Sequence, residues 1–185
     1  MKATFKRKSK IKKTDKKWII RIILWSFAVS VSLGLITSGI LPYVSVWAAI
    51  LVLIIFIIIG ILFDIIGIAV AAGTEQPFHS MSSRRVNGAA KALYLIRNAE
   101  KVSNLCNDVI GDISGIISGA ITALIVFKFG DNIYLSLGLT GLVAALTIGG
   151  KGIGKGFALR YANEIIYRVA LLTGSFDKKI KREKI

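Results

Sequence analysis

The chain has very few of the residues on which most enzymes and soluble metal sites depend. Among its 185 residues there is one cysteine, Cys106, and one histidine, His79. A single cysteine excludes an internal disulfide and a cysteine-based metal site, and a single histidine excludes a histidine-cluster site within one chain. No Ser–His–Asp or paired-carboxylate hydrolase arrangement has support. We therefore expect a protein that is not an enzyme and has no resident cofactor, with Cys106 as a small buried hydrophobe.

Acidic residues are also scarce, with 10 Asp and Glu against 25 Lys and Arg, for a net charge of +15. In a soluble protein this excess would suggest nucleic acid binding. Here 54% of the residues are hydrophobic, the mean hydropathy is +0.67, and the charges are separated from the apolar runs. Because a soluble domain is less apolar, we expect an integral membrane protein whose partner is the lipid bilayer and not nucleic acid.

Long apolar runs predict an all-α fold with about four transmembrane helices. In chain order we expect a basic arm (1–17), a first span (18–39), a second apolar run (44–73), and spans at 105–127 and 133–149. The second run is longer than the roughly 20 residues that a bilayer requires. Because Asp64, Gly67 and Gly73 interrupt its second half, we expect a strongly tilted or broken helix there.

Two further segments are predicted to form amphipathic helices at the membrane surface. After Pro77, the segment 74–103 mixes apolar and basic residues with helical spacing, and so does LRYANEIIYRVALL at 159–172, before a charged tail (173–185). If 74–103 and both termini are cytoplasmic, every Lys and Arg except Lys128 lies on that side. The positive-inside rule therefore predicts a multi-pass protein of the cell membrane with cytoplasmic termini.

Three carboxylates within or beside the apolar spans are the main candidates for function: Asp64, Asp108 and Asp112. Each costs roughly 2.5–3.5 kcal/mol to insert, so each requires a partner or a purpose. Asp108 and Asp112 are four residues apart on one helix face, flanked by Asn107 and Ser114, and such oxygen ligands suit a hard cation such as Mg²⁺. The alternative is a structural role, in hydrogen bonds between helices or at the hydrated interface.

Two glycine patterns have structural interpretations. Small residues at Gly111, Gly115 and Gly119 make a GxxxG-type ridge that lets another helix approach closely. The segment 149–156, GGKGIGKG, matches the GxxxxGK pattern of nucleotide-binding loops, but Gly156 stands where a Ser or Thr should hold Mg²⁺ and a membrane helix precedes it. We therefore expect no nucleotide binding there.

Three segments, in order, resemble motifs in the transmembrane domain of the CorB/CorC/cyclin-M family of magnesium transporters. Residues 72–82, AGTEQPFHSMS, are similar to S-G-S/A-E-x-A-L-x-S-x-S at the end of that domain's first span. Residues 106–113, CNDVIGDI, resemble G-N-x-L-V-N-I at the start of its next span. Residues 150–164, GKGIGKGFALRYANE, are similar to G-E-x-x-P-K-x-x-A-x-R-x-x-E. The resemblance covers 44–172, and the first span would be an addition.

The resemblance implies a homodimer that binds dehydrated Mg²⁺ through side-chain oxygens and freed backbone carbonyls. On this sequence the metal site would comprise Asp108, Asp112, Asn107, Ser114, Gly73 and Thr74, joined by Asp64, with Glu75 and Lys155 in cytoplasmic-side contacts. The chain departs from the family pattern at Ala72 (Ser in the family), Lys151 (Glu) and Gly154 (Pro). The family's nucleotide-binding CBS domains do not follow in this sequence, so a CBS-containing partner chain is a candidate.

The sequence thus predicts a membrane protein that binds Mg²⁺ or a similar divalent cation between transmembrane helices and, as the resemblance implies, transports it. Two alternatives stay open. One is a non-transporting scaffold or partner subunit that packs through small-residue helix faces. The other is a cationic lipid-binding membrane protein that acts through its basic arm.

Overall fold

The computed structural model describes residues 16–40, 43–130 and 132–182, and its regular elements are all helices. They are α1 (Lys16–Ile40), α2 (Val46–Ala72), α3 (Gln76–Ser83), α4 (Ala89–Arg97), α5 (Ala99–Asn104), the π-helical segment η2 (Leu105–Gly111), α6 (Asp112–Lys128), α7 (Ile133–Arg160) and α8 (Ala162–Arg182). The predicted all-α class is confirmed for these residues.

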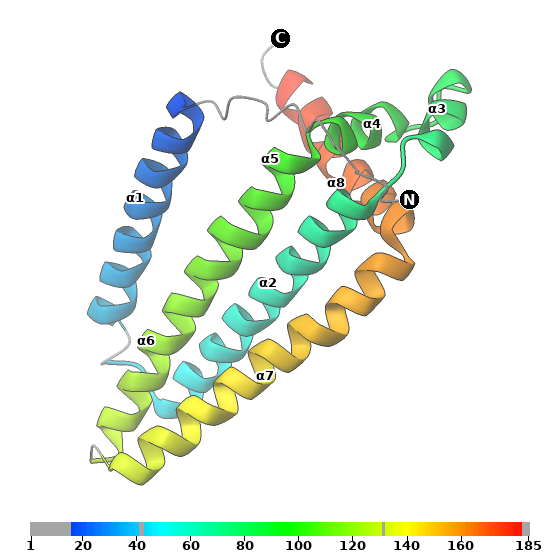
Figure 1. Cartoon of the computed structure of the whole chain (residues 1–185). Helices are drawn as coiled ribbons and strands as arrows, with labels where there is room; N and C mark the ends of the chain where they lie inside the picture. Colours follow the sequence, from blue (N-terminus) through cyan, green and yellow to red (C-terminus); the bar gives the residue numbers. More distant parts are fainter. Residues whose placement is uncertain (1–15, 41–42, 131, 183–185) are drawn as a thin grey trace, which may run out of the picture.

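Three helices are long and apolar enough to cross a membrane: α2, the continuous helix Ala99–Lys128 formed by α5, η2 and α6, and α7 (Figure 1). They match the second, third and fourth predicted spans, although α7 also includes the basic segment that we expected to follow it. The first predicted span coincides with α1, whose described residues give a shorter apolar helix, Ile20–Ser32. Of the four predicted spans, three are confirmed as helices with the length and the apolar composition that a span requires.

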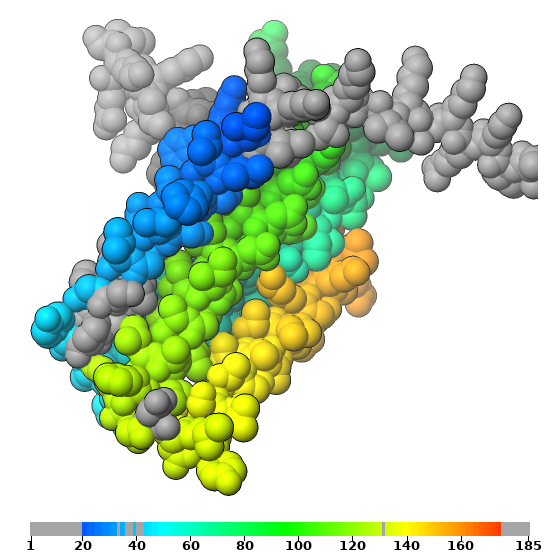
Figure 2. Space-filling view, turned by 60° about the vertical axis from the view of Figure 1, so that its left-hand side comes forward, coloured from blue at the N-terminus to red at the C-terminus, as the bar shows by residue number. Residues whose placement is uncertain are grey.

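Helix α2 is central, because α5, η2, α6, α7 and α8 all pack against it. Buried aliphatic side chains at helical spacing, such as Leu53 and Ile57 on α2 and Ile117 and Ile121 on α6, form the main apolar core. Figure 2 shows α1 (blue) lying along α6 (green), with α7 (yellow) on the other side of α6. Because lipid tails are as apolar as these side chains, close van der Waals packing holds such helices together.

One end of the three long helices is covered by α3, α4 and α8 (Figure 1). Phe78 of α3, Leu93 of α4 and Ile166 of α8 form a second buried cluster with Val70 near the end of α2. The two segments predicted to be amphipathic thus bury apolar residues against each other and against α2. The start of α1 lies at this same end of the molecule.

Of the two alternatives for the second apolar run, a strongly tilted or a broken helix, the broken one is wrong, because α2 is one uninterrupted helix from Val46 to Ala72. In a bilayer an interrupted backbone leaves costly unpaired groups, and glycines are tolerated where a neighbouring helix approaches closely. The irregular turn is instead η2, where the third span is wound as a π-helix. Single π-helical turns within α-helices occur frequently at functional sites.

Candidate cation site between α2, η2 and α7

Polar and small residues line the contact between α2 and the η2–α6 helix. A side chain at Gly67 would overlap the Asn107 amide, and a Cβ on Gly60 would lie 3.3 Å from Ser114 Cβ. The two helices run antiparallel, so Asp64, midway between the two glycines, faces the region of Gly111. We call the six residues Gly60, Asp64, Gly67, Asn107, Gly111 and Ser114 the polar seam.

Several oxygen atoms of η2 and α6 are directed at α2 along this seam. The Gly111 carbonyl oxygen and Ser114 Oγ each lie 3.9 Å from the Cβ position of Gly60. Ser114 is 4% exposed, and its hydroxyl donates to the Ile110 carbonyl at 2.8 Å, which leaves its oxygen free to accept or to ligate. The seam therefore presents carbonyl and hydroxyl oxygens inside the helical bundle.

Asn107 is the least satisfied member of the seam. Its Oδ1 is buried and has no hydrogen-bond partner among the described residues. A buried polar atom left without a partner costs about 1–3 kcal/mol, so it requires an explanation such as a bound water molecule or an ion. This oxygen lies against Gly67, about one helical turn from Asp64.

Asp64 has a partner on the third long helix. Its side chain is 16% exposed, and its Oδ1 lies 3.9 Å from Lys151 Nζ on α7. The Lys151 ammonium also lies 3.6 Å from the Cβ position of Gly111, so the missing side chain of that glycine leaves room for it. Lys151 thus joins the α7 helix to the polar seam.

Close approach of α7 to α2 brings Lys151 to this position. A side chain at Gly150 would overlap Ile61, and a Cβ on Gly154 would come within 2.7 Å of Ile65. One turn further on, Ala158 packs against Ala69. Glycines at two successive turns therefore let α7 approach α2 closely enough for the Asp64–Lys151 pair to form. The GxxxxGK match lies within this helix, and not in a phosphate-binding loop.

The other predicted carboxylates lie elsewhere. Asp108 and Asp112 are exposed, on a different side of the helix from Asn107 and Ser114. Within the described ranges no three His, Cys, Asp or Glu side chains are grouped so that they could hold a metal ion. The structure thus brings Asp64, Asn107 and Ser114 to the α2–α6 contact, and it does not bring Asp108 and Asp112 to it within one chain.

Gly73 and Thr74 occupy a separate contact at the end of α2. The Thr74 backbone N–H donates to Asn163 Oδ1 at 3.0 Å, and Asn163 Nδ2 donates to Thr74 Oγ1 at 3.1 Å. A side chain at Gly73 would overlap Ile166 of α8. These residues join α2 to α8. Lys155, which is predicted from the sequence to make a cytoplasmic-side contact as Glu75 does, is exposed on α7.

Glu75 makes a polar cluster that links the loop after α2 to α3 and α4. Its Oε2 lies 3.0 Å from His79 Nε2 and 3.3 Å from Arg97 Nε. The hydrogen bond from His79, followed by that from Arg97, lowers the pKa of Glu75 below its ordinary value. In the structure the contacts of Glu75 are therefore with His79 and Arg97.

A depressed pKa predicts a pH-dependent contribution to stability from Glu75. Its stabilisation is present above the pKa of the unfolded chain and is lost as the pH falls through the lower folded-state pKa. We expect Glu75→Gln to lower the thermal midpoint at pH 7 by about 1–3 °C, as for an exposed pair, and the difference to shrink progressively as the pH falls below the ordinary glutamate pKa of 4.5. Glu100→Gln, at another exposed glutamate, is the control. A difference from wild type that persists unchanged at the lower pH would contradict this explanation.

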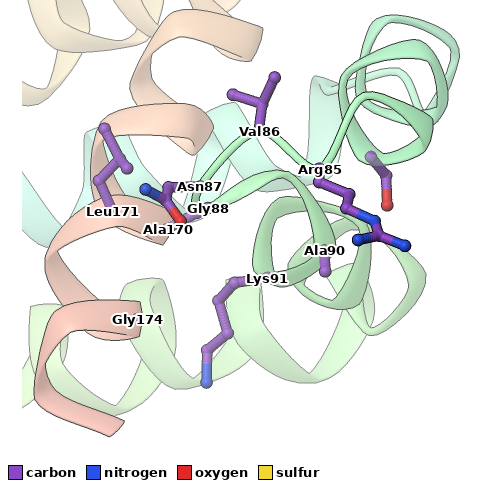
Figure 3. A pocket seen from close by; sticks show the side chains of 10 residues that line it. Arg85, Val86, Asn87, Gly88, Ala90, Lys91, Ala170, Leu171 and Gly174 are labelled. Carbon is purple, nitrogen blue, oxygen red and sulfur yellow. The ribbon is translucent and has the colours of Figure 1, made fainter. Parts of the chain in front are cut away.

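A hollow of about 630 Å³ lies between the α3–α4 turn and α8 (Figure 3). Arg85 and Lys91 lie at its edge, and Gly88 adopts a positive φ of 85° at the start of α4. Its described lining includes no carboxylate: Ser82, Arg85, Val86, Asn87, Gly88, Ala90, Lys91, Ala170, Leu171 and Gly174. This chemistry does not suit a cation, so the polar seam is the better candidate site.

Comparisons with protein-family models, with curated proteins and with solved structures gave no match for this chain.

Proposed function

We propose that this chain is a multi-pass membrane protein that binds a divalent cation such as Mg²⁺ at the polar seam and moves it across the bilayer. The observation that carries the proposal is the buried Asn107 oxygen, which has no hydrogen-bond partner among the described residues and lies one turn from the Asp64 carboxylate, between helices long and apolar enough to cross a membrane. An ionisable residue in such a place is by default a candidate functional site, and ion pathways are among the roles that such residues have.

The oxygen set of the seam fits a hard cation. Mg²⁺ and Ca²⁺ are bound by carboxylates, amide and backbone carbonyls, hydroxyls and water. Asp64 would supply the negative charge and Asn107 Oδ1 a neutral oxygen, while the Gly111 carbonyl and Ser114 Oγ, beside Gly60, would supply neutral oxygens further along the path of the ion. The resemblance to the magnesium transporters of the CorB/CorC/cyclin-M family, reached from the sequence motifs, suggests the same class of ligand.

The topology in this proposal has α1 as the fourth span and both termini in the cytoplasm. All Lys and Arg except Lys128 then lie on the cytoplasmic side. The layer formed by α3, α4 and α8 would face the cytoplasm, and the α6–α7 connection would face outward. Asp64 lies eight residues from the end of α2, about 12 Å along the helix, and so within the bilayer on its cytoplasmic side.

Mg²⁺ flux into liposomes that contain the purified protein and a trapped Mg²⁺-sensitive dye tests this function. We expect flux above that of empty liposomes for wild type, and background flux for Asp64→Asn, because the variant loses the charge that attracts the ion. Asp112→Ala is the matched control, since its carboxylate is exposed, and it should retain more than about half of the wild-type rate. Background flux from wild type would remove the transport function.

A second candidate function is a non-transporting scaffold or partner subunit. The outer face of α7 carries a line of glycines with open space around them, at Gly138, Gly141, Gly149, Gly152 and Gly156. Such a line permits close packing of another helix, either from a second copy or from a CBS-containing partner. A scaffold would keep its oligomeric state in Asp64→Asn and show no flux in any variant.

A further inference from the structure

We propose that Lys151 is a tethered competitor for the cation, whose ammonium occupies the place beside Asp64 that the metal ion takes. The ammonium has to withdraw when the ion binds. This inference rests on the proposed function and adds the residue that regulates occupancy of the site.

The geometry of the pair shows that it is loose. A charge-assisted N–H···O bond is about 2.7–2.9 Å long, whereas Lys151 Nζ and Asp64 Oδ1 are 3.9 Å apart. The ammonium lies in the space left by the missing side chain of Gly111. The Lys151 side chain is 30% exposed and that of Asp64 only 16%, so the lysine has the freer route out of the seam.

Charge balance makes occupancy by the ammonium and by the metal ion mutually exclusive. Asp64 and Lys151 together carry no net charge, so a divalent ion added beside both would leave two uncompensated positive charges among apolar helices. Like charges a few ångströms apart repel strongly where the dielectric constant is low. Withdrawal of the ammonium on its flexible four-carbon stem relieves that repulsion and leaves the carboxylate to the ion.

The hydrogen bonding of the seam oxygens also supports the proposal that Lys151 competes with the metal ion. Asn107 Oδ1 accepts no hydrogen bond from the ammonium or from any other described group. The lysine therefore substitutes for the charge of the ion without satisfying all of the ligand oxygens. A bound ion must also be able to leave, and a competing ammonium keeps its binding weak enough for release.

Titration of the purified full-length chain with Mg²⁺ alone, followed by calorimetry, tests the proposal. Lys151→Met removes the competitor and should tighten the dissociation constant about tenfold or more, whereas a lysine with a merely structural role would weaken binding when removed. Lys155→Met, at an exposed lysine one turn along α7, should leave the constant unchanged. Asp64→Asn combined with Lys151→Met should abolish binding.

Amine acetylation of the wild-type protein supplies a measurement that does not depend on the folding of a variant. Mg²⁺ should raise the modification of Lys151 severalfold, read by mass spectrometry, and leave Lys155 unchanged. If wild type binds Mg²⁺ but Lys151→Met binds no more tightly and Mg²⁺ does not expose the amine, the competitor role is wrong and the cation site stands. If neither wild type nor Lys151→Met binds Mg²⁺, the proposed function fails and this inference fails with it.

Discussion

Replacing Asp64 with leucine is expected to destabilise the folded chain by about 2–3 kcal/mol, because it leaves the Lys151 ammonium among apolar helices without its carboxylate. Breaking a fully buried ion pair by removing one partner typically costs about 3–5 kcal/mol. We expect a smaller value because the Lys151 side chain retains 30% exposure and the pair is loose. Reversible unfolding in mixed detergent micelles measures the difference from wild type.

The double variant Asp64→Leu, Lys151→Leu is the critical control for this prediction. Replacing both partners of a buried pair with apolar residues is often neutral or stabilising. The double variant should therefore recover most of the lost stability while it stays unable to bind the cation. A double variant as unstable as Asp64→Leu alone would show that the cost does not arise from the orphaned lysine.

Leucine in place of Gly154 is expected to separate α7 from α2 and to cost about 3 kcal/mol, the upper part of the usual range for overpacking. Even a Cβ at this position would come within 2.7 Å of Ile65 Cγ1, and a larger side chain would also meet Ile61. Because the same contact places Lys151 beside Asp64, the variant should also alter cation binding.

Gly152→Leu on the same helix is the matched control. No described atom of another helix lies within 4 Å of a Cβ at Gly152, so this variant should unfold at about the same detergent concentration as wild type or slightly above it. Helix propensity favours both substitutions equally, by about 1 kcal/mol, so the comparison isolates the packing term. Equal stability of the two variants would refute the close approach at Gly154.

The residues predicted from the sequence include Asp64, Asn107 and Ser114 of the polar seam, but also two carboxylates that the structure places outside it. Asp108 and Asp112 attracted attention because they are four residues apart at the start of a span, yet both are exposed. The nearby Asn107, Gly111 and Ser114 are the residues that face α2. Hydrophobic periodicity distinguishes faces only where one face is polar, and a membrane helix is apolar on most sides.

In the sequence, Lys151 is only a departure from a family motif and part of a misleading nucleotide-loop pattern. The available signal was a lysine between glycines, in a helix long enough to span a membrane. It could not be interpreted without the register of α7 against α2, because Gly150 and Gly154 decide which residue of α7 reaches Asp64.

The sequence by itself determined the all-helical fold and the positions of three helices long and apolar enough to cross a membrane, because a bilayer requires about 20 consecutive apolar residues with internally satisfied backbone groups. It also identified Asp64 as costly. The tertiary structure decided that Asp64 pairs with Lys151, that Asn107 Oδ1 has no hydrogen-bond partner among the described residues, and that the irregular helical turn lies in η2 and not in α2. These outcomes depend on which helix faces meet, and close packing of small residues between helices sets that choice.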